Sequence, residues 1–343
     1  MAMAAWDKIE ISVVIPTYNR KQRLLSLLHN LSASSFAVKE VIIADSGSDH
    51  LSATEIASFT KLSIVNLYPA TASVCIQRNA GVAIATSPWI FICDDDIEVP
   101  DDYLEKLVAH ILKERQVVAV SGNVLHFEKD KWVPYFTERS ARQLLWKYFF
   151  GLGIWGTIEV KQNWFTKKIT GSYKKKGNHI AKTGWPILTD FSGSYFTVPM
   201  YGLGAAVINK QWLQQVKYDE TIDTNGIGDN YGLAINFPPQ SIHIVNDAFV
   251  LHHKETSNRL DQSLQFYRRI LALDYFRQVN NNIGHVKKRW LLWSLTGCLF
   301  QFIITGNRPH TKACWKLILK IAANKNDYVI GAAQNKKLIG PVL

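Results

Sequence analysis

Cysteine is scarce in this chain, and no two cysteines stand close together. The four are Cys75, Cys93, Cys298 and Cys314, and none of them forms a CxxC pair. We therefore expect neither a disulfide framework nor a zinc knuckle, because both need closely spaced cysteines. Such sparse usage is typical of a reducing compartment, and we expect a cytoplasmic protein.

Long hydrophobic runs are also missing. Residues 1–10 contain no such run, so we expect no signal peptide. The longest apolar stretch, residues 290–305, is interrupted by polar residues and glycine, and it is shorter than the roughly 20 residues that a membrane-spanning helix needs. No internal repeat is visible. The sequence therefore predicts no membrane-spanning helix.

What is present is a globular composition. The chain has 343 residues, of which 47% are hydrophobic and 20% are charged. That length is enough for a sizeable core, and it predicts either two domains or one large domain with an appendage.

Charge is unevenly placed along the chain. The formal net charge is +11, but residues 1–110 carry thirteen acidic and only eight basic side chains. Residues 285–343 carry ten basic side chains and the single acid Asp327. An acidic half would repel phosphate backbones, so we expect no nucleic-acid partner. The asymmetry indicates an acidic catalytic part and a basic docking surface.

The first third of the chain alternates between predicted strands and helices. Leu24, Leu27, Leu28 and Leu31 form the apolar stripe of one helix, which Asn19 could cap. Pro16 is expected to end the first strand. The predicted strands cover residues 9–15, 41–44, 63–67 and 89–93, and the later helices cover residues 73–85 and 100–112. This order predicts a Rossmann-like, mostly parallel sheet with a site at the carboxyl ends of its strands.

Two later segments have a different character. Residues 131–190 are rich in aromatics and lysine without a clean period, which predicts an insertion or lid, partly mobile around residues 171–177. Near the C-terminus, a basic run at residues 287–289 precedes a lysine stripe. That stripe, Lys312, Lys316 and Lys320, lies beside an apolar face formed by Trp315, Ile318, Leu319 and Ala322. A basic amphipathic helix of this kind favours an anionic membrane surface, and the alternative is a helix packed on protein.

Three consecutive carboxylates, Asp94, Asp95 and Asp96, follow the apolar strand at residues 89–93. Such a cluster is costly unless a cation neutralises it. If the strand continued, residues 94 and 96 would face the same side and could share one ion. Oxygen ligands favour Mn²⁺ or Mg²⁺ together with substrate phosphates. The alternative is a solvated acidic turn before Pro100.

Three further segments map to the same sheet edge. Residues 16–20 form a strand-to-helix turn suited to a nucleotide or phosphate, or else Thr17 and Asn19 merely cap the helix. Asp45, at the end of the second strand, could bind a base or ribose, or could form an Asx turn. Arg78, on a helix, could pair with a diphosphate, or could simply be solvated. The convergence of these segments predicts one nucleotide crevice.

The ordered set Val-Val-Ile-Pro-Thr-Tyr-Asn-Arg, Ile-Ile-Ala-Asp-Ser-Gly-Ser, Arg-Asn-Ala-Gly and Phe-Ile-Cys-Asp-Asp-Asp resembles glycosyltransferase family 2 over roughly residues 9–256. The resemblance implies the glycosyltransferase-A fold, with a catalytic domain over residues 1–256 and a helical, basic C-terminal segment over residues 257–343. It also implies a metal-dependent, inverting glycosyltransferase of the hexosyltransferase type. Such an enzyme would move a sugar from a nucleotide-diphosphate sugar to a glycan or lipid-linked acceptor, in cell-surface polysaccharide synthesis.

The resemblance also assigns roles to single residues. Pro16, Thr17, Tyr18 and Asp45 would form the nucleoside pocket, and Arg78, Asp94 and Asp95 would contact the nucleotide. Asp94 and Asp96 match the metal-binding DxD motif, although Cys93 could stand for its first acid, which would make Asp95 the second. His252 or His253 could complete the metal site, or be structural. Residues 201–206 resemble the small-residue strand on the acceptor side.

Asp229 corresponds to a later acidic motif and is the expected general base. Gly228 stands where the family usually has a second acid, so Asp229 could instead cap the following helix, and Asp223 and Glu220 are the fallback bases. Two other functions stay open. One is a nucleotidyltransferase, although a glycine-rich phosphate loop is lacking. The other is a non-catalytic membrane adaptor with a degenerate transferase fold.

Overall fold

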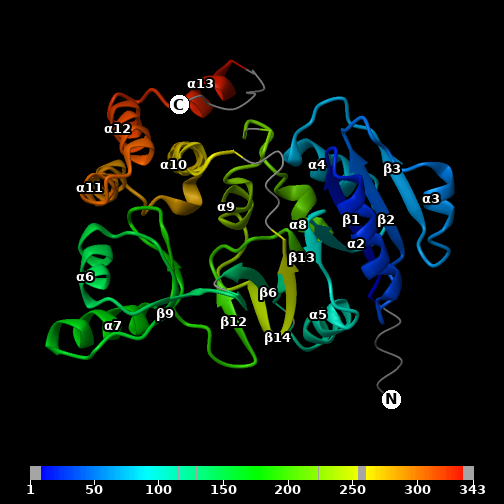
Figure 1. Ribbon diagram of the computed structural model, residues 1–343, viewed down its shortest axis with the longest axis horizontal. Coiled ribbons are helices and arrows are strands. Elements are labelled where there is room, and N and C mark those ends of the chain that lie inside the picture. Colours follow the sequence, from blue (N-terminus) through cyan, green and yellow to red (C-terminus); the bar gives the residue numbers. More distant parts are fainter. Residues whose placement is uncertain (1–8, 115, 129, 223, 254–259, 335–343) are drawn as a thin grey trace.

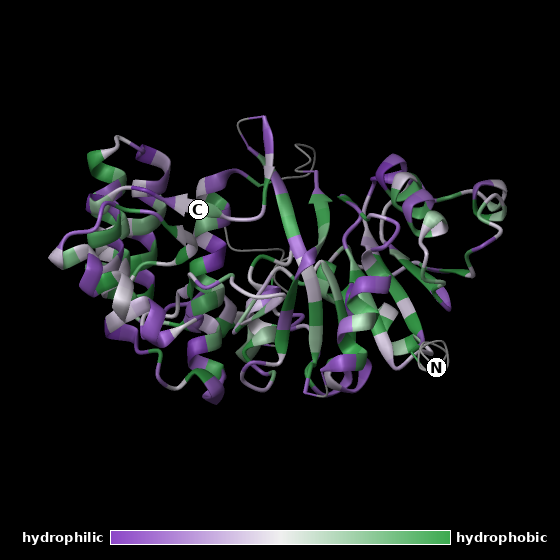
Figure 2. Cartoon of the chain, turned by 90° about the horizontal axis from the view of Figure 1, so that it is seen from below, coloured by the Kyte–Doolittle hydropathy of each residue, from purple (hydrophilic) through white to green (hydrophobic). Residues whose placement is uncertain are grey.

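The computed structural model describes residues 9–114, 116–128, 130–222, 224–253 and 260–334. Its centre is a mixed, mostly parallel sheet with the strand order β12-β14-β6-β13-β4-β1-β2-β3 (Figure 1). Hydrophobic residues run along its strands, whereas the surrounding helices alternate between hydrophobic and hydrophilic residues (Figure 2). This pattern is typical of a sheet covered by amphipathic helices on both faces.

The N-terminal part of the sheet is parallel. Its strands are β1 (Ile11–Thr17), β2 (Glu40–Asp45), β3 (Ile64–Leu67) and β4 (Trp89–Cys93). The helices between and after them are α2 (Lys21–Ala33), α3 (Ala53–Ala57), α4 (Val74–Ile84) and α5 (Tyr103–Lys113). The leucine stripe predicted for the first helix is buried on α2. The alternation predicted from the sequence is confirmed.

Two local predictions at the junction of β1 and α2 were wrong. Pro16 does not end the strand, since it pairs in register with Ala44 and Thr17 pairs with Asp45. The neighbouring strand β4 pairs only as far as Val14, so this end of β1 has a partner on one side alone, where proline is tolerated. Asn19 does not cap α2, because the capping position is Arg20 and no side chain bonds there.

The other half of the sheet is mixed. Its longer strands are β6 (Ala119–Glu128), β12 (Tyr195–Val198), β13 (Ala205–Asn209) and β14 (Ile242–His252). The short strands β5 (Ile97–Glu98) and β7 (Lys131–Val133) pair with β14 and β6. Two short helices, α8 (Lys210–Gln215) and α9 (Asp229–Ala234), complete this part. Since β5 directly follows Asp96 and pairs with the end of β14, the acidic turn is joined to His252 through the backbone.

Within the predicted insertion or lid at residues 131–190, the part that follows β7 folds into a small second layer. Four strands form a sheet in the order β10-β11-β9-β8, and two helices pack on it. The elements are β8 (Phe136–Glu138), α6 (Ala141–Phe150), β9 (Ile154–Ile158), α7 (Trp164–Lys176), β10 (His179–Ile180) and β11 (Pro186–Leu188). Gly171 lies inside α7, and Gly177, with a φ of 61°, ends that helix. The segment expected to be mobile is therefore mostly helical.

The C-terminal region is helical, as expected. It contains α10 (Gln262–Val279), a 3₁₀ turn at Asn281–Ile283, α11 (Lys288–Ile304), α12 (Arg308–Ala322) and α13 (Asp327–Ala333). Leu271, Leu291 and Leu317 belong to the same buried cluster as Ile92 and Ile244 of the large sheet. Among the residues that the structure describes, no helix is both long and apolar enough to cross a bilayer.

The two faces of α12 differ from each other. Its buried residues are Ala313, Cys314, Leu317 and Ile321. Trp315 and Leu319, from the apolar face noted in the sequence, are 55% and 52% exposed. The helix therefore packs on the protein through one apolar face and presents a second one outward.

Candidate active site

A cavity of about 1290 Å³ lies at the carboxyl ends of β1 and β4. Pro16, Thr17 and Tyr18, the three acids at residues 94–96, Asp229 and His252 all line it. These residues come from sequence segments that are far apart, and the parallel strands bring them to one edge of the sheet. Apart from Asp45, the segments predicted to form one crevice therefore meet in one cavity. Its volume is large enough for a nucleotide sugar together with part of an acceptor.

Arg78 is the electrostatic centre of the cavity. It is buried, and its guanidinium bonds to Asp229 through Nη1 and to Asp94 through Nη2, the latter at 2.5 Å. Burial alone would lower the pKa of this guanidinium, but Asp94 and Asp229 outweigh that effect and raise the pKa well above its ordinary value. Arg78 therefore stays charged and holds two carboxylates from distant parts of the chain in fixed positions.

Gly81 explains how Arg78 reaches this place. The two residues lie one turn apart on α4, and a Cβ at position 81 would clash with the Val14 side chain of β1. The glycine thus lets α4 approach the strand closely, which brings Arg78 to the sheet edge.

The three acids at the end of β4 point to different partners. The strand stops at Cys93 and a turn covers Asp95 and Asp96, so the strand alternation that would put residues 94 and 96 on one side does not continue. Asp94 bonds to Arg78. Asp95 accepts hydrogen bonds from Thr17 Oγ1 at 2.7 Å and from Arg20 Nη1 at 2.8 Å.

Asp96 occupies a third position. One of its oxygens lies 3.5 Å from Arg20 Nη1, and the other lies 3.4 Å from His252 Nε2.

Asp95 and Asp94 differ in how far they are enclosed. Burial raises the pKa of the Asp95 carboxyl to about 6, although Arg20 and Thr17 lower this pKa. Asp95 is therefore enclosed by protein groups, whereas Asp94 is partly open to the cavity.

Gly204 makes room for Asp94. A Cβ at position 204 would overlap Asp94 Oδ2, and the Asp94 backbone N–H donates to the Gly204 carbonyl at 2.8 Å. This position belongs to the small-residue stretch singled out in the sequence. It shapes the carboxylate site directly.

The nucleoside residues predicted at the first two strands divide into two groups. Pro16, Thr17 and Tyr18 line the cavity, and Tyr18 is exposed to it. Asp45 is not among the cavity-lining residues. Its carboxylate accepts from the Gly47 N–H at 2.8 Å and faces His50 Nδ1 at 2.8 Å.

Asn19 supports the same turn. Its backbone has a φ of +52°, and its side chain accepts a hydrogen bond from the Ser48 N–H at 2.8 Å. The loops after β1 and β2 are thus tied to each other, and the Asx turn proposed as the alternative for Asp45 is present.

The structure separates the two histidines. His252 lines the cavity beside Asp96, and its Nδ1 lies 3.3 Å from Nδ1 of His126. His253 is not part of the cavity lining, and its Nε2 lies 3.0 Å from Glu98. Between these two, His252 has the position from which a ligand bound at the acidic turn could be reached.

Asp229 begins α9 and lies between two parts of the cavity. It is buried, it bonds to Arg78, and its Oδ1 accepts the N–H of Asn230 at 2.6 Å. Gly228, whose φ of 104° suits glycine, holds the capping position, so Asp229 is the first residue inside the helix. Of the fallback bases, Glu220 bonds to Asn79 and is absent from the cavity lining, and Asp223 lies outside the described residues.

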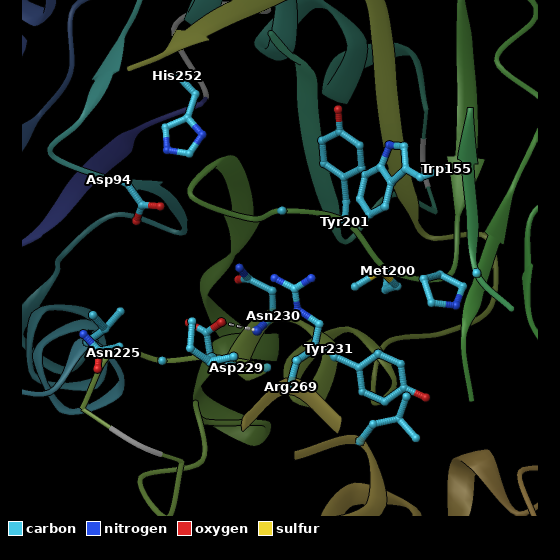
Figure 3. A pocket seen from close by; sticks show the side chains of 18 of the residues that line it. Asp94, Trp155, Met200, Tyr201, Asn225, Asp229, Asn230, Tyr231, His252 and Arg269 are labelled. Atoms are coloured by element: carbon cyan, nitrogen blue, oxygen red, sulfur yellow. Dashed lines mark hydrogen bonds between the residues drawn. The ribbon is translucent and has the colours of Figure 1, made fainter. Parts of the chain in front are cut away.

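The opposite wall of the cavity was not foreseen residue by residue. It is contributed by the second layer, by the segment around Met200 and by α10, and it includes Trp155, Trp185, Met200, Tyr201 and Arg269. The rings of Trp155 and Tyr201 lie 5.4 Å apart between centroids (Figure 3). Two sequence signals pointed to this wall, namely the aromatic enrichment of residues 131–190 and the stretch at residues 201–206, which begins with Tyr201. The α10 residue Arg269 had no such signal.

The model of the family described as glycosyl transferase family 2 matches residues 12–182. The chain belongs to this family. The family resemblance that the ordered strand-end motifs predicted is therefore confirmed.

Two curated relatives resemble parts of this glycosyltransferase. The uncharacterized glycosyltransferase YwdF of Bacillus subtilis (strain 168) is 30% identical over 132 residues, which is 38% of this chain and 48% of YwdF. The uncharacterized glycosyltransferase YibD of Escherichia coli (strain K12) is 29% identical over 113 residues, which is 32% of this chain and 33% of YibD. The chain thus matches about half, or less, of the length of these relatives.

Solved structures show the same fold. The mannosyltransferase PcManGT of Pyrobaculum calidifontis, in complex with GDP-Man and Mn²⁺, has a TM-score of 0.50 at 13% identity, covering 95% of this chain and 86% of that one. GalNAc-T7, with UDP, GalNAc and Mn²⁺, has a TM-score of 0.52 at 13% identity, covering 79% and 50%. This family 2 enzyme therefore has the glycosyltransferase-A architecture with an added helical C-terminal region.

Proposed function

We propose that this glycosyltransferase is a metal-dependent, inverting enzyme that moves a sugar from a nucleotide-diphosphate sugar to a hydroxyl of a glycan or lipid-linked acceptor. The observation that carries the proposal is the meeting of Thr17, Asp94, Asp96, Asp229 and His252 in one cavity. The similar enzymes PcManGT and GalNAc-T7 were solved with a nucleotide or nucleotide sugar and Mn²⁺, which supports the same ligand class here.

The chemistry of the acidic turn suits Mn²⁺ or Mg²⁺. Asp94 and Asp96 offer carboxylate oxygens and His252 offers an imidazole nitrogen, all of which are ligands for these cations. Within the described residues, no three His, Cys, Asp or Glu side chains converge closely enough to hold an ion by themselves. The remaining ligands would be phosphate oxygens of the donor, and a cation there would neutralise charge on the leaving diphosphate.

The chain's own groups then account for the transfer. Asp229 takes the proton of the acceptor hydroxyl while the hydroxyl oxygen attacks the anomeric carbon. The bond from the anomeric carbon to the diphosphate oxygen breaks, and the configuration inverts. Arg78 fixes the orientation of Asp229 and contributes positive charge close to the Asp94 side of the site. The second layer forms part of the cavity wall, and its closure over the donor would exclude water and suppress donor hydrolysis.

A thermal-shift screen tests the donor site. UDP, GDP, TDP and CMP are each added with and without Mn²⁺ to wild type, Asp96→Ala and the control Asp101→Ala, whose exposed acid lies outside the cavity. A ligand at 100 times its Kd adds about 2.7 kcal/mol of stability. We expect one nucleotide to stabilise wild type and Asp101→Ala only with metal, and Asp96→Ala to lose the effect. If no nucleotide stabilises wild type, the proposal is wrong.

We further propose that the enzyme works at the inner, cytoplasmic face of an anionic membrane, where a lipid-linked acceptor for cell-surface polysaccharide synthesis would be presented. The outward face of α11 and α12 carries exposed apolar side chains, namely Trp290, Phe300, Ile303, Ile304, Trp315 and Leu319. Lys312 is exposed beside them, whereas Lys320 is paired with Asp327. Exposed tryptophan among basic residues is typical of an interfacial helix.

Co-sedimentation with vesicles tests this docking. The full chain is mixed with phosphatidylcholine vesicles, with and without phosphatidylglycerol, at low and high salt. We expect binding that needs phosphatidylglycerol and weakens with salt, and that is lost in a Trp315→Ser, Leu319→Ser variant. Tyr68→Ser, an equally exposed aromatic beyond β3 on the opposite side of the molecule, is the matched control (Figure 1). Absence of binding by wild type at low salt would contradict the proposal.

A further inference from the structure

Three arginines line the cavity, and their charges are balanced differently. Arg20 faces Asp95 and Asp96, and Arg78 faces Asp94 and Asp229. Arg269 of α10 also lines the cavity, but no ion pair or hydrogen bond joins its side chain to any other described residue. Arg269 is thus the arginine of this site whose charge the described protein groups do not compensate.

The surroundings of Arg269 differ from those of Arg78. The Arg269 side chain is exposed, whereas Arg78 is buried, and no carboxylate among the described residues pairs with Arg269. Its neighbour Arg268 is buried and donates to Asn225 Oδ1 at 3.1 Å. The helix itself is held by Asn326, which donates to the Leu271 carbonyl at 2.8 Å. Arg269 therefore stands on a rigid element, with its guanidinium open to a ligand that enters the cavity.

The position of Arg269 indicates which ligand this is. In Figure 3, Asp94 and His252 lie on one side of Asp229, while Arg269, Met200 and the pair Trp155 and Tyr201 lie on the other. In an in-line displacement the acceptor hydroxyl approaches the anomeric carbon from the side opposite the leaving diphosphate, and the general base must lie within hydrogen-bond reach of that hydroxyl. Groups beyond Asp229, as seen from the acidic turn, therefore face the acceptor.

We propose that Arg269 pairs with a negatively charged group, a phosphate or a carboxylate, on an acceptor sugar that packs against the aromatic wall of Trp155 and Tyr201. This rests on the proposed function, because it uses Asp229 as the boundary between donor and acceptor. A guanidinium binds either group through two parallel hydrogen bonds, and aromatic faces accept the apolar side of a sugar ring. The substrate class is thus an anionic glycan instead of a neutral one.

The test compares charged and neutral sugars on the full chain. Glucose 6-phosphate, glucuronate and glucose are titrated by calorimetry into enzyme saturated with Mn²⁺ and the nucleotide diphosphate found in the thermal-shift screen. The saturating nucleotide keeps the added phosphate away from the donor site. The variants are Arg269→Gln, the charge-preserving Arg269→Lys, and the control Arg142→Gln, an exposed α6 arginine outside the cavity lining.

We expect wild type to bind at least one charged sugar at least tenfold more tightly than glucose. Arg269→Gln should remove that preference and leave the nucleotide Kd within about twofold, Arg269→Lys should keep part of it, and Arg142→Gln should behave as wild type. The phosphate and carboxylate arms show which group is preferred.

Two results would overturn the proposal. One is an equal affinity of wild type for charged and neutral sugars. The other is a tenfold loss of nucleotide affinity in Arg269→Gln with unchanged sugar binding, which would place Arg269 at the donor diphosphate. If no nucleotide binds to wild type, the proposed function fails instead, and the same titrations without nucleotide still test Arg269.

Discussion

The two walls of the cavity differ in how their charges are balanced. The wall built on β1 and β4 is a closed polar network in which Arg20, Arg78 and His252 each face a carboxylate. The wall built by the second layer and α10 carries several aromatic rings and the ion pair of Lys147 with Glu138, whereas its Arg269 has no such partner among the described residues. In our proposal, the first wall is organised around its own side chains, and the substrate supplies the partner of Arg269 in the second. We expect substitutions in the two walls to separate donor handling from acceptor handling.

The largest effect is expected at the boundary between the walls. Asp229→Asn should lower the rate of nucleotide release from the donor sugar by about 10²–10⁴-fold, because the attacking hydroxyl or water loses its base. The nucleotide Kd should change by less than about threefold. Glu220→Gln, a fallback base outside the cavity lining, is the control and should keep wild-type turnover. Wild-type turnover in Asp229→Asn would show that the base is another residue.

Asp229→Asn also removes one partner of the buried Arg78. Melting temperatures must therefore be compared, since loss of one carboxylate from a buried pair is destabilising even when the fold survives.

A smaller effect is expected from a single methyl group on the donor side. Gly204→Ala would displace the Asp94 carboxylate, because the new Cβ overlaps Asp94 Oδ2. Metal-dependent nucleotide affinity should fall about tenfold or more, measured by calorimetry with and without Mn²⁺. Gly202→Ala is a close control, since nothing lies within 4 Å of a Cβ there. Equal affinities in both variants would show that Asp94 does not act in nucleotide binding.

A substitution in the aromatic wall should weaken sugar binding and leave nucleotide binding unchanged. Trp155→Ala removes one of two neighbouring rings. We expect about a tenfold loss of affinity for those methyl glycosides that wild type binds, with unchanged nucleotide affinity. Calorimetric titration of both ligands checks this. A parallel loss of nucleotide binding would mean that the two walls are not separate.

The smallest effect concerns pH and lies away from both walls. His110 Nε2 lies 2.8 Å from His243 Nδ1, and burial, followed by the repulsion of His243, lowers the pKa of His110 to about 4. The unfolded chain therefore binds more protons between pH 6.5 and 4, so this histidine makes stability fall as pH falls through that range. The expected slope is about 1 kcal/mol per pH unit.

Asp95 titrates with the opposite sign over part of this range, because its folded pKa is raised to about 6. The informative quantity is therefore the difference in unfolding free energy between wild type and His110→Gln. That difference should shrink as the pH is lowered from 6.5 towards 4, as followed by denaturant unfolding. A constant difference would contradict the pKa assignment.

Much of the donor side could be predicted from the sequence. Short β-branched runs, the leucine stripe of α2 and the polar residues at strand ends are local signals, and parallel strands necessarily bring those ends together. The prediction that Pro16 ends the first strand was wrong because β1 has a neighbouring strand on only one side at this residue, where proline can continue the strand. Local pattern cannot show how many neighbours a strand has.

The remaining site depends on contacts between distant segments. Nothing in the sequence shows that Arg78 would hold Asp94 and Asp229 together, since the two acids are separated by more than a hundred residues. The strands of the second layer are short, and its helices α6 and α7 are rich in aromatics and lysine, so no clean period stood out. For α12, the sequence showed the apolar stripe at residues 315–322. It did not show that the helix would pack on the protein through the face of Ala313, Cys314, Leu317 and Ile321.

The pairing of β5 with the end of β14 has a consequence for how this enzyme could diversify. The His253 N–H donates to the Asp96 carbonyl at 2.9 Å, and His252 is in register with Ile97. The position of residue 252 relative to the acidic turn is therefore set by main-chain bonds that do not depend on which side chain it carries. If His252 holds a metal as proposed, evolution or design can exchange that side chain for another ligand, and so change the metal preference, without rebuilding the scaffold that presents it.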